Sequence, residues 1–161
     1  MKVLEFAINM ELDGEKYYTD QAEINKKNGL SKVFLLLAAD EKNHAKTLTN
    51  RLNNISGTFI ISDALSVSKN IFSNLKSFKD EYTLIPSQLD AYRAALEKEE
   101  ESITLYKKLL TEAQSETDKI LFQSLIKDEE SHRNVLDDLV LLLNNVDDWV
   151  ESAEFNITKE Y

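Results

Sequence analysis

The chain contains two histidines, and both stand in the same short pattern. His44 lies three positions after Glu41, and His132 lies three positions after Glu129. Residues three apart share one face of a helix, so each Glu-x-x-His unit can offer a carboxylate oxygen and an imidazole nitrogen to one metal ion. Two such units in one chain predict a metal site built from several helices.

An internal repeat singles out further residues of the same kind. Shifting the chain by 88 positions superposes its first half on its second half without a gap, and nine of the first 52 positions are then identical. Steps of three, four or seven connect these positions within each helix, which places them on one helix face. The identical pairs are Ala7/Ala95, Glu11/Glu99, Tyr18/Tyr106, Phe34/Phe122, Leu37/Leu125, Asp40/Asp128, Glu41/Glu129, His44/His132 and Leu48/Leu136.

Glutamates on this shared face indicate what the site binds. The ordinary core of a bundle explains the Ala, Phe and Leu pairs, but an ionised carboxylate in a core is costly unless it is paired or binds a metal. Four carboxylates and two imidazoles suit two iron ions, with manganese possible, better than tetrahedral zinc. The predicted metal ligands are Glu11, Glu41, His44, Glu99, Glu129 and His132.

Long helices must position these ligands, and three Gly and one Pro in 161 residues leave few tight turns. Apolar spacing predicts a first helix over residues 2–27, which Gly29 closes in the left-handed conformation. A second helix, capped by Ser31, is predicted to end near residues 53–54. Because the link between them is very short, these two helices must be antiparallel neighbours.

A second hairpin is predicted over residues 86–113 and 116–144, with Pro86 in its first turn. Ser115 followed by Asp118 forms a capping box at the start of its second helix.

The connection between the hairpins, residues 54–86, is long and contains a short amphipathic helix within 63–75. Two helical hairpins joined by such a crossover predict an all-α, ferritin-like antiparallel four-helix bundle. We expect one domain over residues 1–145, followed by a C-terminal tail, part helical, over 146–161.

Composition excludes several classes of protein. The chain has no Cys, which rules out disulfides, thiolate zinc sites and iron–sulfur clusters. A formal charge of −10 disfavours nucleic acid and anionic membrane partners and attracts metal cations. The longest apolar run, residues 139–143, is far too short for a membrane span, so a cytoplasmic protein is expected.

These motifs resemble the rubrerythrin-related branch of the ferritin-like superfamily. The segments Ala7-Ile8-Asn9-Met10-Glu11 and Ala95-Leu96-Glu97-Lys98-Glu99, each with a tyrosine seven residues after its last glutamate, match that family's helix pattern. The two Glu-x-x-His units match its other two helices, and the similarity spans about residues 3–145.

The resemblance implies a diferrous oxidoreductase that reduces hydrogen peroxide or reacts with dioxygen. Electrons would come from a separate donor protein, because the chain lacks the cysteines of a fused rubredoxin module. The resemblance also implies a homodimer, with Glu41 and Glu129 bridging two irons, Glu11 and Glu99 as terminal ligands, and one histidine on each iron.

Four further residues on the shared face are candidates for supporting the ligands. Tyr18 and Tyr106 could hydrogen-bond the ligand carboxylates, or they could be aromatic core packing. Asp40 and Asp128 could each orient a histidine across the bundle through its second nitrogen, or they could be solvated helix charges.

Two positions depart from the family pattern. Rubrerythrins typically carry another glutamate three residues after the third-helix ligand, and Ser102 stands there in this chain. The matching first-helix position is Gly14, which suggests space near the metals. A register with Glu97 and Glu100 in place of Glu99 would resemble the paired glutamates of classical rubrerythrins and stays open.

Three functions remain open from the sequence. The first is a di-iron peroxidase or oxidase in oxidative-stress defence. The second is a ferroxidase or iron-handling protein. The third is a metal-free helical interaction protein, which would need its buried carboxylates to be protonated or exposed.

Overall fold

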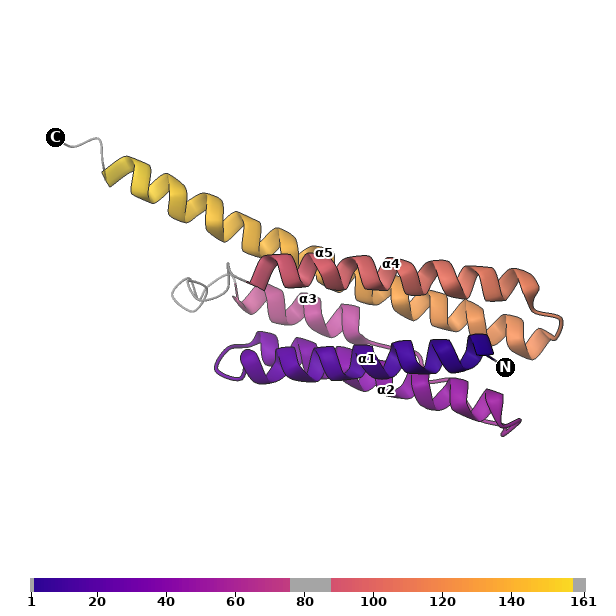
Figure 1. Cartoon of the computed structure of the whole chain (residues 1–161). Helices are drawn as coiled ribbons and strands as arrows, with labels where there is room; N and C mark the ends of the chain where they lie inside the picture. Colours follow the sequence, from indigo (N-terminus) through magenta and orange to yellow (C-terminus); the bar gives the residue numbers. More distant parts are fainter. Residues whose placement is uncertain (1, 76–87, 158–161) are drawn as a thin grey trace.

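The computed structural model describes residues 2–75 and 88–157, and side chains within 2–73 and 88–144. Over these residues the chain forms helices and no strands, which confirms the predicted all-α class. Figure 1 shows the long helices running side by side, with α3 lying along them. The helices are α1 (Lys2–Ile24), α2 (Leu30–Leu52), α3 (Ala64–Leu75), α4 (Leu89–Glu112) and α5 (Glu116–Ile157).

The turn between α1 and α2 differs from the prediction. Gly29 has φ −66° and ψ −14°, so the expected left-handed glycine is wrong. Ser31 is not the cap either, because Asn28 Oδ1 accepts the Leu30 N–H at 2.9 Å. Asn25 also donates its side-chain amide to the Gln21 carbonyl at 2.8 Å. Asparagine side chains therefore satisfy the backbone of this turn, and no left-handed residue is needed.

Two other helix ends follow the sequence more closely. Helix α2 ends at Leu52, and Asn54 takes the left-handed conformation with φ 55°. Ser115 Oγ accepts the Asp118 N–H at 3.0 Å, as expected for the cap of α5. Pro86, the predicted start of the next long helix, lies outside the described residues.

Helix α5 is longer than predicted, because it continues past Asn144 to Ile157. Residues 145–157 contain neither Gly nor Pro, so the sequence offers no strong stop signal there. In Figure 1 the yellow C-terminal part of α5 leads away from the other helices.

Two apolar clusters fill the bundle on either side of a polar layer. The larger cluster includes Phe34, Leu37, Tyr92 and Leu139, and the smaller one includes Leu125. Along each of the four long helices, the predicted ligands fall between residues of the two clusters. The apolar clusters hold the helices together, and the polar layer between them is kept out of water.

The connection after α2 closes one side of the bundle. Helix α3 packs against α2 and α5. Ala64, Ser68 and Phe72 are buried on its inner face. None of the described helices is long and apolar enough to cross a membrane.

Candidate metal centre

The structure brings all six predicted ligand side chains into the polar layer. Glu11 comes from α1, Glu99 from α4, and one Glu-x-x-His unit from each of α2 and α5. None of the six residues is more than 4 % exposed. They form two groups, Glu11, Glu41, His44 and Glu129, and Glu41, Glu99, Glu129 and His132, and within each group one ligand atom per residue lies within 4.8 Å of the others.

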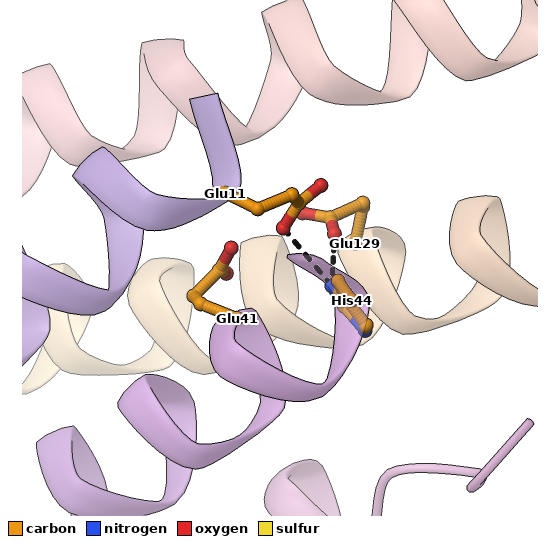
Figure 2. A group of neighbouring side chains, drawn as sticks. All are labelled: Glu11, Glu41, His44 and Glu129. Carbon is orange, nitrogen blue, oxygen red and sulfur yellow. Dashed lines mark hydrogen bonds and ion pairs between the residues drawn. The ribbon is translucent and has the colours of Figure 1, made fainter. Parts of the chain in front are cut away.

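Figure 2 shows the first of these groups, with side chains from three helices pointing toward one another. His44 Nδ1 lies 3.2 Å from Glu11 Oε2 and 2.9 Å from Glu129 Oε1. In the second group, His132 Nδ1 lies 3.0 Å from Glu41 Oε1 and 3.8 Å from Glu99 Oε2. The two groups share Glu41 and Glu129, so they are halves of one site.

The third-helix register is decided by burial. Glu99 lies inside the bundle, whereas Glu97 and Glu100 are exposed. The alternative register that the sequence left open is therefore not the one in this fold. Ser102 also faces inward, and its hydroxyl donates to the Lys98 carbonyl at 3.0 Å.

Both aspartates contact a histidine of the opposite hairpin. His44 Nε2 lies 3.2 Å from Asp128 Oδ2, and His132 Nε2 lies 3.0 Å from Asp40 Oδ2. Each contact fixes one ring nitrogen and leaves Nδ1 directed at the glutamates. Of the two readings of these aspartates, orientation of a histidine is the one that the geometry favours.

Each of the two tyrosines also donates a hydrogen bond to a predicted ligand of the opposite hairpin. Tyr18 donates its hydroxyl to Glu99, and Tyr106 donates its hydroxyl to Glu11. Burial, followed by the charge of the partner glutamate, raises the pKa of both phenols well above 10. They therefore remain protonated donors, and they are also buried core residues.

Sequence reasoning missed two residues beside the histidines. Ser62 donates its hydroxyl to Asp40, and its N–H lies 3.3 Å from Asp128 Oδ1. Phe59 stacks on His44 with ring centroids 6.1 Å apart. Both lie in the irregular connection before α3, where no helix periodicity could have revealed them.

In the metal-free chain, the surroundings of the four close-packed glutamates raise the pKa of two of them and lower the pKa of the other two. Burial and the charge of Glu11 raise the pKa of Glu41, and burial and the charges of Glu11 and Glu99 raise that of Glu129. Although burial opposes it, hydrogen bonding to Glu41 and the charge of His44 lower the pKa of Glu11 to about 2. The pKa of Glu99 is also lowered, because contact with His132 outweighs burial.

The surrounding carboxylates overcome burial at both histidines. The pKa of His44 is raised by Glu11 and Asp128, and that of His132 by Asp40 and Glu41. These shifts favour the protonated forms of Glu41, Glu129 and both histidines, and the ionised forms of Glu11 and Glu99, in the metal-free layer.

The donor set fits a pair of divalent cations. Glu129 Oε1 and His132 Nδ1 are buried without a hydrogen-bond partner, although ligand atoms of other residues lie close by. Buried polar atoms without a hydrogen bond are costly, and metal ions bound within the two groups would satisfy both atoms. Two divalent cations would also neutralise the charge of the four glutamates when all four are ionised.

A cavity of about 660 Å³ reaches this layer from the side where α1 faces α4. Glu41 and Glu99 are among its lining residues, together with Gly14 and Ser102. A Cβ atom at Gly14 would lie 3.0 Å from Glu41 Oε2, so a larger residue there would displace this carboxylate. The missing side chain at position 14 therefore makes room for the Glu41 carboxylate, and Gly14 also lines the cavity beside it.

Fold and site together define a helical bundle with a buried carboxylate and histidine layer that could hold metal ions. The family model named Rubrerythrin matches residues 2–140, and the chain belongs to this family. Membership indicates a redox or iron-handling function and a metal, typically iron. A comparison with curated proteins and one with solved structures found no match.

Proposed function

We propose that the chain binds two iron ions and reduces hydrogen peroxide or reacts with dioxygen. The observation that carries this proposal is that two groups of ligand atoms share Glu41 and Glu129. Under the proposal, Glu41 and Glu129 would be shared by both ions, Glu11 and Glu99 would each hold one ion as terminal ligands, and His44 and His132 would each hold one ion through Nδ1. Manganese would accept the same oxygen and imidazole donors.

The bound metals would supply the electrons for reduction, and a separate donor protein would restore them. The protein's own part is to hold the ligands in place. Tyr18 and Tyr106 keep Glu99 and Glu11 oriented through O–H donors that do not ionise at neutral pH. Asp40 and Asp128 hold the Nε2 side of each histidine, and Phe59 shields His44.

Ser102 limits how closely the chain can follow the typical rubrerythrin cycle. Its hydroxyl lies 3.4 Å from Met10 Sδ and donates to a backbone carbonyl, and it cannot replace a glutamate as an anionic ligand. Any cycle in this chain therefore proceeds with the four glutamates of the buried layer. Ser102 and Gly14 leave room for a peroxide beside Glu41 and Glu99.

Metal analysis combined with stopped-flow oxidation tests the proposal. We expect two iron ions per chain, and oxidation of the ferrous protein by peroxide with turnover when a reductant is supplied. Glu99→Gln should reduce iron content, whereas Glu97→Gln, two positions away but exposed, is the matched control and should not. Absence of bound iron in the wild-type chain would exclude the proposal and favour the metal-free interaction protein.

The same measurements separate the iron-handling alternative. Oxidation of added ferrous iron by dioxygen, without reductant-dependent peroxide turnover, would indicate a ferroxidase. The size of the particle in solution is a further test of iron storage, because storage of iron requires a large closed shell.

A further inference from the structure

The two sides of the buried layer differ in how they are covered. On the side of α2 and α5, Ser62 contacts both aspartates, Phe59 stacks on His44, and α3 packs over the seam. On the side of α1 and α4, the 660 Å³ cavity lies between solvent and the carboxylates of Glu41 and Glu99. In the part of the chain that the structure describes, the cavity between α1 and α4 therefore gives a molecule a route to Glu41 and Glu99.

This cavity is far larger than peroxide needs. Hydrogen peroxide has about the volume of two waters, on the order of 60 Å³. Pockets for organic ligands measure about 300–1,000 Å³, the range in which this cavity falls. Its volume thus suits an organic molecule with a reactive end at the carboxylates.

Most of the cavity lining is apolar. Met10, Leu105, Ala91 and Ala95 line the walls. Phe6, which also lines the cavity, is 62 % exposed, whereas Glu41 and Glu99 are each 4 % exposed. The apolar lining therefore extends from solvent to the predicted metal ligands, and an apolar tail would gain by leaving water there.

Charges at the mouth favour a neutral ligand. Lys98 Nζ lies 2.9 Å from Glu101 Oε2, so these two lining residues offset each other. Asp13, which is exposed and also lines the cavity, leaves these lining charges net negative and so disfavours an anionic group beside them. A fatty-acid hydroperoxide is thus less suitable than an uncharged one.

We propose that this cavity binds a neutral, apolar organic hydroperoxide, with its tail between α1 and α4 and its peroxide group beside Glu41 and Glu99. The inference rests on the proposed peroxide-reducing function and names its substrate class. The O–O bond would break with uptake of two electrons and two protons, and the two bound ferrous ions would supply one electron each. The products are the alcohol and one water, and a donor protein then reduces the two ferric ions.

Binding and turnover of two related compounds test the inference on the iron-loaded full chain. Equilibrium dialysis measures binding of 2-phenyl-2-propanol, the unreactive alcohol product, and stopped-flow kinetics compares cumene hydroperoxide with hydrogen peroxide. Ala94→Phe fills the mouth at an exposed helix position that lines the cavity. Ala39→Phe is the matched control, because Ala39 is an exposed helical alanine outside the lining.

We expect the wild-type chain and the Ala39→Phe variant to bind the alcohol at one site. Ala94→Phe should weaken this binding at least tenfold and lower the cumene hydroperoxide rate at least tenfold relative to the hydrogen peroxide rate. Ala91→Phe, also in the lining, replaces Ala94→Phe if that variant does not fold.

Failure of the inference and failure of the proposed function give different results. Normal hydrogen peroxide turnover without alcohol binding, or with a rate ratio unaffected by Ala94→Phe, would overturn the substrate class alone. A chain that reduces neither peroxide would overturn the proposed function and the hydroperoxide step with it.

Discussion

Hydrogen bonds between the two halves of the repeat orient the carboxylates of individual predicted ligands. Tyr106 donates to Glu11 and Tyr18 donates to Glu99, so each hairpin orients a carboxylate of the other. Loss of a residue that orients a metal ligand typically lowers metal affinity about 10–100-fold.

Tyr106→Phe should accordingly weaken iron binding by about 10–100-fold, because Glu11 loses its donor while the buried ring remains. Competition with a chelator of known affinity measures the change. Tyr92→Phe is the control, since the Tyr92 hydroxyl bonds Asn25 and Gln88 away from the ligands. Equal effects of the two substitutions would show that the hydroxyl of Tyr106 has no special role.

Protons in the polar layer make the stability of the metal-free chain depend on pH. The folded-state pKa values of Glu41, Glu129 and both histidines are raised, so the folded state binds more protons than the unfolded state. The free energy of unfolding should therefore fall as pH rises above about 4.5 for the glutamates and above about 6.5 for the histidines. Thermal unfolding in a chelator between pH 5 and pH 8 measures this decline.

A double variant, Glu41→Gln with Glu129→Gln, provides the control for this pH effect. Glutamine resembles the protonated glutamate but does not ionise, so the decline should become shallower. An unchanged slope would assign the effect to repulsion among the other acidic residues of this chain of net charge −10.

At the scale of the helices, a half-buried ion pair joins the two hairpins. Arg51, in the last turn of α2, contacts both carboxylate oxygens of Asp118 in the first turn of α5, with Nη2 to Oδ2 at 2.8 Å. The Arg51 side chain is 38 % exposed and the Asp118 side chain 15 %, so solvent weakens the attraction.

A double-mutant cycle with Arg51→Ala and Asp118→Ala should give a coupling of up to about 1 kcal/mol, because the pair is bidentate but partly solvated. Denaturant unfolding at low and high salt measures the coupling, which should shrink with salt. A coupling that is zero at low salt would show that the pair adds nothing to the contact between hairpins.

For the whole molecule, the bundle and the end of α5 separate into two parts. Among the side chains that the structure describes, the two apolar clusters and all six predicted ligands lie within residues 7–143, whereas α5 continues to Ile157. The homodimer expected from the family resemblance stays a prediction, and light scattering of the purified chain would test it.

Removing residues 145–161 should leave the iron content unchanged. The unfolding temperature should shift by less than about 4 °C, which corresponds to about 1 kcal/mol of stability in a chain of this size. The iron content should persist because the six predicted ligands all precede residue 145, and the temperature shift should be small because the end of α5 leads away from the other helices in Figure 1. Loss of iron from the shortened chain would show that the end of α5 supports the site.

The sequence by itself determined the ligand layer. Glu11, Glu41, His44 and their repeats at an offset of 88 could be predicted because helix periodicity places them on one face. Their apolar neighbours, such as Phe34 and Leu125, identified that face as the buried one. Four glutamates on a buried face then require bound cations or protons, because negative charge in a core must be compensated.

Only the tertiary structure decided what surrounds this layer. Ser62 and Phe59 reach the histidines from an irregular connection, and irregular backbone follows no repeating pattern that a sequence can reveal. The sequence-based expectations for Gly29 and Ser31 are wrong because side-chain hydrogen bonds of neighbouring asparagines set the turn. The cavity between α1 and α4 depends on the distance between two helices, which packing of the whole bundle fixes.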